Sequence, residues 1–221
     1  MNCKPDMIGE TGLHFFGKMS ATNCHDIKNA LAIINENIGL LQDFILMSEK
    51  GMAIDQERLK TLAEKVVKQV WRADGFVKNM SRFAHSIDEP VVNVDLNEIL
   101  ELVKMLSSRF VSMRGVTLKP EPSMNPVMVT TNPFLLENLV WLCLDFAMEV
   151  AGSGKTVGLI TEETKDGARI RFTHIEGLKE ASTDMFPTEQ AKALLKTLNG
   201  ELTPDAGAGE LALILPRDIG S

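Results

Sequence analysis

The sequence predicts two domains of different fold class: a helical hairpin over residues 1–90 and an α/β sandwich over residues 91–221. Before Pro90, apolar residues recur at three- and four-residue spacing through two long stretches, the pattern of supercoiled helices. After Pro90, short apolar, mostly β-branched runs alternate with amphipathic stretches, which is typical of an α/β domain. A chain of 221 residues is long enough for each domain to bury its own core.

The first long helix is expected from about Met19 to Glu49, after a loop or short helical lead-in over residues 1–18. At about 100° per residue, its apolar residues fall within about 40° of one direction. They are Ile27, Leu31, Ile34, Ile38, Leu41 and Ile45. This apolar seam points about 200° away from His25. The histidine is therefore expected to project into water among short and polar neighbours.

The second helix is expected to begin near Gln56, after a turn that ends in an N-cap at Asp55. Its apolar positions keep the same spacing over four heptads: Leu59, Leu62, Val66, Val70, Ala73, Val77, Met80, Ala84 and Ile87. Two antiparallel helices with such seams cannot bury them alone. We therefore expect a homodimer in which two hairpins form a four-helix bundle, with both His25 imidazoles on its outside.

The second domain is assigned from capping and turn residues, taken in chain order. Strands are expected at 91–94, 116–118, 127–130, 156–161, 168–173, 201–203 and 210–215, and helices at 95–110, 133–150 and 188–198. Asp95 can cap the first of these helices, and Asn132-Pro133 opens the second. This order predicts a mixed sheet with helices on one face.

The composition excludes several classes of function. The net charge of −7 and the absence of any run rich in lysine or arginine argue against a nucleic-acid partner. No apolar run approaches the ~20 residues of a spanning helix, and the N-terminus lacks a signal-like segment. We therefore expect no membrane partner and a cytoplasmic protein. The three cysteines, Cys3, Cys24 and Cys143, suit neither a disulfide framework nor a zinc site.

One motif on the first helix carries chemistry: Cys24-His25-Asp26-Ile27-Lys28-Asn29-Ala30-Leu31. A lone histidine on a helix is most often a solvated polar residue. Here an acid follows at once, then a cation, and then an asparagine four positions on. With the heptad-patterned helix pair, the motif resembles the H-box of bacterial histidine kinases and of dimeric histidine phosphotransferases. Many H-boxes carry a proline where this chain has Ala30, so its first helix should run straighter.

The second domain resembles the ATP-binding domain of histidine kinases, but it lacks the residues that hold nucleotide in that family. Trp141 and Asp145 stand where paired asparagines would coordinate magnesium. The adenine turn would be Thr173-His174-Ile175-Glu176-Gly177, without its acid and its first glycine. The phosphate segment 185–190 has no glycine, and slipping the alignment cannot restore one. The only glycine between positions 172 and 198 is at 177. We therefore expect no cofactor of the chain's own.

A third motif, Ala151-Gly152-Ser153-Gly154-Lys155-Thr156, looks like part of a P-loop. A P-loop needs a further glycine where this chain has Glu149, and it must lie between a strand and the following helix. Here a helix precedes a strand. We interpret the stretch as a helix C-cap and turn.

The resemblance implies a histidine phosphotransferase of a two-component phosphorelay, which moves a phosphoryl group between the receiver aspartates of response regulators through His25. Asp26 would fix the imidazole tautomer and Lys28 would balance charge on the phosphoryl oxygens. Asn29 would orient a hydrolytic water, or is a plain surface residue. Magnesium is expected on the partner receiver domain.

Receiver docking is expected beside His25 at Ile33 and Leu40, unless both pack against the second helix of their own subunit. Two alternatives remain. One is an ATP-dependent sensor histidine kinase, or a fragment of one. The other is a non-catalytic adaptor that binds receiver domains, in which His25 would be dispensable.

Overall fold

The computed structural model describes residues 5–179 and 185–220. Both predicted kinds of element are present, a pair of long helices and an α/β domain, so the fold class is confirmed. Contacts group the chain into two compact units, Met1–Met19 with Phe83–Ser221, and Ser20–Arg82. These units do not coincide with the division expected near residue 90, because the start of the first helix packs within the α/β unit. Each unit is described separately.

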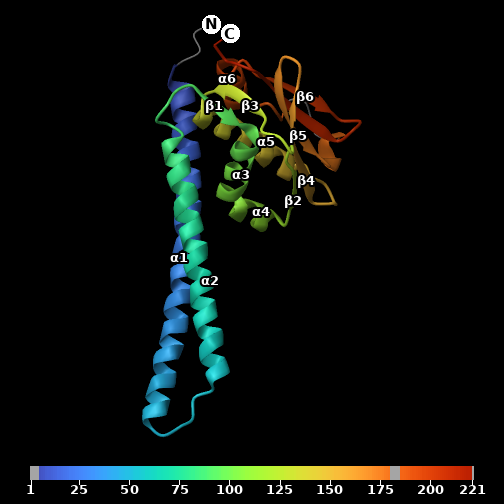
Figure 1. Cartoon of the computed structure of the whole chain (residues 1–221). Helices are drawn as coiled ribbons and strands as arrows, with labels where there is room; N and C mark the ends of the chain where they lie inside the picture. The colour runs from blue at the N-terminus through green and yellow to red at the C-terminus, as the bar shows by residue number, and fades with distance from the viewer. Residues whose placement is uncertain (1–4, 180–184, 221) are drawn as a thin grey trace. The chain divides into compact units, whose positions relative to one another are not determined.

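The two long helices are α1 (Pro5–Glu49) and α2 (Gln56–His85), shown in Figure 1. The start of α2 is as predicted. The expected loop over residues 1–18 is wrong for the described part, because the chain is helical from Pro5 onward. Gly12, which suggested an interruption, instead allows close packing. A Cβ atom there would lie 3.0 Å from Cε1 of Phe134.

The contacts at the start of α1 are aromatic. The ring of Phe15 packs edge-on against Phe83 at 5.1 Å between centroids and lies 5.8 Å from the ring of Phe134. Phe16 stacks on the other side of Phe83 at 5.4 Å. Phe83 is fully buried. This cluster joins the first turns of α1 to the end of α2 and to α5, and it explains why residues before 20 belong to the α/β unit.

Within Ser20–Arg82 the two helices face each other through only part of the predicted seam. On α1 the buried residues of this unit are Asn23, Asp26, Ala30 and Asn37. The seam residues Leu31, Ile38 and Ile45 are 50%, 39% and 50% exposed, and on α2 Val70 and Val77 are 51% and 53% exposed. A single chain therefore leaves a heptad-spaced apolar row uncovered.

The main sheet has the strand order β2-β4-β5-β7-β6, and it is mixed, as predicted. Only β2 and β4 run parallel; the other neighbours are antiparallel. The strands are β2 (Thr117–Glu121), β4 (Thr156–Glu163), β5 (Gly167–Thr173), β7 (Glu210–Pro216) and β6 (Glu201–Asp205). A separate two-stranded sheet pairs β1 (Val92–Asp95) with β3 (Met128–Thr131).

The helices of this unit begin and end at the capping residues that the sequence indicated. Asp95 accepts a hydrogen bond from the backbone N of Asn97, and Asn132 accepts one from Leu135. The expected helix 95–110 breaks at Ser107 into two. The helices are α3 (Leu96–Leu106), α4 (Ser108–Arg114), α5 (Pro133–Glu149), the 3₁₀ turn η1 (Glu176–Lys179) and α6 (Glu189–Thr197).

The core of the α/β unit lies between the sheet and its helices. Ala168, Ile170 and Phe172 alternate along β5 and are fully buried, as strand periodicity requires. Cys143 of α5 is also fully buried, and this burial raises the pKa of its thiol. The cysteine is therefore a protonated core residue.

The expectation that no apolar stretch is long enough to span a membrane needs correction for α1. By length and composition alone, the stretch Met7–Glu49 is apolar enough to cross a membrane, with a mean hydropathy of 1.3 in an 18-residue window. Only 11% of this window is buried within the chain, so the stretch is not covered in the way a core helix would be. Glu36 lies within this stretch, and a carboxylate at a bilayer centre would cost about 3 kcal/mol or more.

Candidate functional site

His25 lies on α1 with its side chain 48% exposed. Its neighbours Cys24, Lys28 and Asn29 are exposed too, whereas Asp26 turns toward the interior of the hairpin. The helix thus presents the imidazole at the surface of the Ser20–Arg82 unit, as the seam analysis predicted. An exposed neutral imidazole is a nucleophile that a macromolecular partner can reach.

Asn29 contacts the imidazole directly. Its Nδ2 atom lies 3.0 Å from Nδ1 of His25, one helical turn away. The amide oxygen and nitrogen of asparagine exchange places by a half-turn of the side chain. With the oxygen toward the ring, Asn29 accepts a hydrogen bond from Nδ1–H, and the lone pair then resides on Nε2. Asn29 is therefore placed to select the imidazole tautomer.

Asp26 and Lys28 lie near His25 but contact it less closely. The Asp26 carboxylate is only 10% exposed, and its Oδ1 is 3.8 Å from Nδ1 of His25, beyond hydrogen-bond distance. It can still stabilise positive charge on the ring. The predicted hydrogen bond from Nδ1 to Asp26 is thus replaced by one involving Asn29. Lys28 is exposed on the same helix.

The two residues expected to dock a receiver differ in exposure. Leu40 is 43% exposed, whereas Ile33 is half-buried. Asn37, between them, donates a 2.7 Å hydrogen bond from Nδ2 to the carbonyl oxygen of Ile33. Leu40 is therefore the more accessible apolar contact on this part of α1.

The nucleotide site that the fold leads one to expect does not fit this chain at its magnesium end. Trp141 is 2% exposed and has no ligand atom for a metal. Nζ of Lys18 lies over its indole ring, 4.6 Å from the centroid. The carboxylate of Asp145 forms ion pairs with Arg114 at 2.8 Å and with Lys18 at 3.8 Å. Two cations of the chain thus pair with Asp145, one of the two residues that the resemblance placed at the magnesium end.

The adenine turn is filled in a similar way. His174 has a φ of 64°, and Ile175 after it is fully buried. Glu176 folds back, and its Oε2 accepts hydrogen bonds from the Ser153 hydroxyl at 3.0 Å and from the Gly154 N–H at 3.2 Å. The P-loop-like stretch is a turn between α5 and β4, as predicted, and it holds a carboxylate of the chain itself.

The phosphate segment lies partly outside the described residues, which omit 180–184. In its described part, the ring of Phe186 stacks on Phe146 of α5 at 4.7 Å between centroids. Thr188 caps α6, because its hydroxyl accepts a hydrogen bond from the N–H of Ala191. Phe186 and Thr188 are thus engaged within the chain, while a cavity of about 840 Å³ stays open beside Lys18, Asn138, Trp141 and Asp145.

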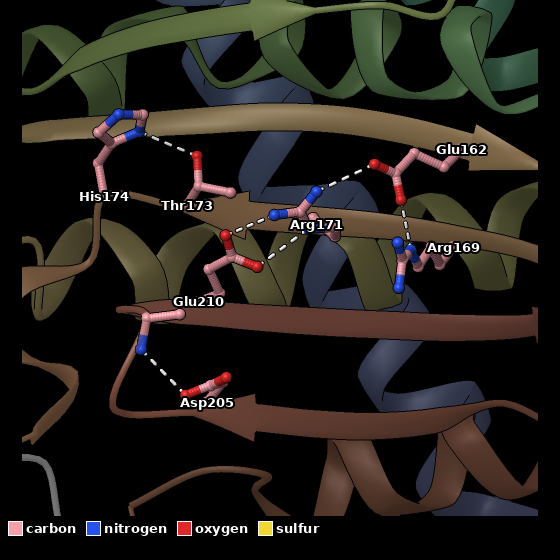
Figure 2. A network of polar contacts seen from close by, with 8 residues as sticks. Glu162, Arg169, Arg171, Thr173, His174, Asp205 and Glu210 are labelled. Atoms are coloured by element: carbon pink, nitrogen blue, oxygen red, sulfur yellow. Dashed lines mark hydrogen bonds and ion pairs between the residues drawn. The ribbon is translucent and has the colours of Figure 1, made fainter.

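A charged network on the sheet was not foreseen from the sequence. Arg171 of β5 donates hydrogen bonds at 3.0 Å to Glu162 of β4 and to Glu210 of β7, and Arg169 also contacts Glu162 (Figure 2). Burial opposes ionisation of Glu162, but the hydrogen bonds from both arginines outweigh it and lower the pKa of this carboxyl. The cross-strand charges stabilise the sheet face opposite the buried side chains of β5.

No group of histidine, cysteine and acidic residues suited to a metal occurs within 5–179 and 185–220. No protein-family model matches the chain, and no curated protein matches it.

Solved structures similar to this chain are of histidine kinases. Acinetobacter baumannii histidine kinase AdeS is 14% identical over 87% of this chain and 98% of its own, with a TM-score of 0.49. Histidine kinase ThkA, in a complex with response regulator protein TrrA, is 17% identical over 95% of this chain and 64% of its own, with a TM-score of 0.48. The ATP-binding domain of PrrB from Mycobacterium tuberculosis is 17% identical over 58% of this chain and 98% of its own, with a TM-score of 0.45. At these values the likeness carries no residue role to this chain.

Proposed function

We propose that this chain is a histidine phosphotransferase of a two-component phosphorelay, which passes a phosphoryl group between receiver aspartates through His25. One observation carries the proposal. The imidazole is half exposed on a helical hairpin, and its Nδ1 lies 3.0 Å from Asn29. That arrangement leaves Nε2 as the nucleophile when Nδ1 holds the proton.

The transfer step needs little from the chain. The Nε2 lone pair of His25 attacks the phosphorus of a receiver aspartyl phosphate. The N–P bond forms as the P–O bond to the aspartate breaks, and its electron pair leaves with the carboxylate. The proton on Nδ1 remains on the ring, where the Asn29 amide accepts its hydrogen bond once the amide oxygen is turned toward Nδ1, and the Asp26 carboxylate stabilises the positive charge. The reverse step returns the phosphoryl group to a second aspartate.

The proposal assigns the magnesium ion to the receiver and no cofactor to this chain. The competing function, an ATP-dependent autokinase, would require the α/β unit to hold magnesium and nucleotide. The ion pairs of Asp145 with Arg114 and Lys18 count against it, as does the indole of Trp141. We therefore favour phosphoryl transfer from receivers over autophosphorylation as the function of this chain.

The proposed molecule is a homodimer. The uncovered row of Leu31, Ile38 and Ile45 on α1, with Val70 and Val77 on α2, is an apolar surface that a second hairpin would cover. We propose a four-helix bundle with a His25 on each side, and a cytoplasmic location.

Radiolabel transfer separates the candidate functions. The protein is incubated with labelled ATP alone, and separately with a receiver domain whose aspartate carries the label. We expect label on the protein only from the receiver, and none in His25→Ala. Labelling by ATP alone would support the kinase. Receiver binding without labelling would support the adaptor.

A further inference from the structure

The basic residues of the hairpin gather on α2. The unit Ser20–Arg82 contains nine of the 23 basic residues and eight of the 30 acidic ones, so it carries a charge of +1 in a chain of −7. Within it, residues 20–49 of α1 have one basic and four acidic residues, whereas residues 56–82 of α2 have seven basic and three acidic. One helix of the pair is therefore the positive one.

Three of the α2 cations share one flank of that helix. The direction toward α1 is given by the half-buried or buried residues Leu62, Val66, Gln69, Ala73, Phe76 and Met80. At about 100° per residue, Lys65, Lys68 and Arg72 lie about 60–120° to one side of this direction. Val70 and Val77, the exposed seam residues, lie about 60–80° to the other side.

The flanks of α1 divide in the same way. Relative to its buried residues, His25, Asn29 and Leu40 lie about 70–130° to one side, and Leu31, Ile38 and Ile45 lie about 70–110° to the other. The two helices run antiparallel, and each angle is measured from the direction of the partner helix. Angles of the same sign and size on the two helices therefore lead to the same side of the pair. The cations of α2 share a flank with His25, and we call it the histidine flank.

The positions along the hairpin also agree. The turn joins Glu49 to Gln56, and Phe15 contacts Phe83, so residue i of α1 is level with about residue 98 − i to 105 − i of α2. By this count Lys65 is level with about residues 33–40, and Arg72 with about residues 26–33. The three cations thus run beside the stretch from about residue 26, next to His25, to about Leu40.

These cations are not neutralised within the chain. All three are exposed, and among the residues that the structure describes none of them forms an ion pair. The guanidinium of Arg72 lies 5.6 Å from the ring centroid of Phe76. By contrast, Arg58 pairs with Asp55 at 3.9 Å and Lys78 with Asp74 at 2.7 Å. Glu36 and Asp43 of α1 lie on the same flank by this count, and neither forms an ion pair with these three cations among the described residues. The positive part of the histidine flank is therefore its α2 side.

We infer that Lys65, Lys68 and Arg72 form an electrostatic docking row for receiver domains whose surface around the aspartyl phosphate is acidic. The inference rests on the proposed function and adds the receiver property that this flank selects. The negative charges of a phosphoryl group and of the carboxylates that hold its magnesium together exceed the ion's two positive charges, so the approaching surface is negative. Charges at the edge of an interface mainly raise the association rate, and salt screens this effect over about 8–10 Å.

The test compares two charge reversals on the same helix. The row variant is Lys68→Glu with Arg72→Glu. The matched control is Lys60→Glu with Lys78→Glu, which makes the same charge change about 160° from the direction of α1. The receiver is one that transfers to wild type, phosphorylated with acetyl phosphate. Rates are measured with receiver below saturation, at about 50 mM and about 500 mM salt.

We expect the row variant to lose about tenfold or more in the second-order transfer rate at low salt, and most of this deficit to vanish at high salt. The control should stay within about twofold of wild type at both. Phosphoramidate, a small donor that needs no docking, should phosphorylate His25 of every variant at the wild-type rate. Neutralisation, Lys68→Gln with Arg72→Gln, should give an intermediate loss.

The outcomes separate the two claims. If wild type transfers and the row variant matches the control, the docking row is wrong and the proposed function stands. A deficit that salt does not reduce, or that phosphoramidate shows equally, also overturns the row. Failure of wild type to accept label from any receiver, or labelling of His25→Ala, overturns the proposed function and the row with it.

Discussion

At the residue scale, the Asn29 side-chain amide lies 3.0 Å from Nδ1 of His25, and the orientation of this amide decides which ring nitrogen holds the proton. The sequence predicted that Lys28 and Asn29 lie near His25 because residues three and four apart are neighbours on a helix surface. It did not indicate that Asp26 turns inward or that Asn29 occupies the hydrogen-bonding position. Those details depend on which flank of α1 meets α2, and packing decides that.

Replacing Asn29 tests the tautomer assignment. Asn29→Asp keeps an acceptor for Nδ1–H and should keep transfer near the wild-type rate. Asn29→Leu loses a hydrogen bond of about 1 kcal/mol, and the rate from phosphoramidate should fall about fivefold. The ¹⁵N chemical shifts of the His25 ring should show a smaller Nδ1–H population in Asn29→Leu and an unchanged one in Asn35→Leu. An unchanged population in Asn29→Leu would leave Asn29 without the positioning role.

The contribution of the Glu162 network to folding stability depends on pH, and the lowered pKa of Glu162 sets the direction of this dependence. The pKa of Glu162 is lower in the folded protein, so its contribution to stability is complete above about pH 4.5 and is lost as pH falls through the folded value. Glu162→Gln should lower the free energy of unfolding by about 0.5–1 kcal/mol at pH 7, since the pair is partly exposed. The deficit should disappear near the acid limit of folding. Glu201→Gln, on β6, is the control and should show no such trend in urea titrations.

At the element scale, heptad periodicity predicted the two helices but not which neighbour covers each face. Leu31 and Ile38 look like ordinary core positions in the sequence, yet both remain exposed in a single chain. Asn23 and Asn37 look like surface positions and are buried. In the proposed dimer, the apolar stripe of α1 contributes to two interfaces, one with α2 and one with the second copy. The spacing of apolar residues does not show which residue belongs to which interface.

Substitutions in this stripe test the proposed dimer. Leu31→Asp with Ile38→Asp should dissociate the dimer, because aspartates would lie at the interface where apolar burial is needed. Leu40→Asp, on the histidine flank and similarly exposed, should leave it intact. Sedimentation equilibrium at micromolar concentration measures both. A monomeric wild type, or dimers in both variants, would remove the four-helix bundle.

At the scale of the whole molecule, the sequence predicted the order of strands and helices well, because residues such as Asp95 and Asn132 mark helix starts by local chemistry. It also led us to expect no nucleotide site in the α/β unit, which stays a prediction. It could not indicate that Lys18 lies beside Trp141 and Asp145. Lys18 precedes Trp141 and Asp145 by more than 120 positions, and no pattern along the chain connects a residue of α1 with an α5 surface that folding brings beside it.

The ion pairs of Asp145 and the buried indole of Trp141 lead us to predict that nucleotide does not stabilise the protein. Magnesium and ATP at millimolar concentration should leave the melting temperature unchanged, whereas a ligand at 100 times its dissociation constant would add about 2.7 kcal/mol. Differential scanning fluorimetry measures this directly. Trp141→Ala should lower the melting temperature, since removal of a buried tryptophan costs about 3–5 kcal/mol. A reproducible upward shift of wild type with ATP would favour the kinase.

The central claim is that the phosphoryl group resides on Nε2 of His25 while it passes between receivers. ³¹P NMR of the protein, separated from a phosphorylated receiver after the exchange, tests this most directly. The account predicts one acid-labile resonance at the shift of Nε2-phosphohistidine, lost in His25→Ala. A resonance from Nδ1-phosphohistidine, or one that survives in His25→Ala, would contradict it.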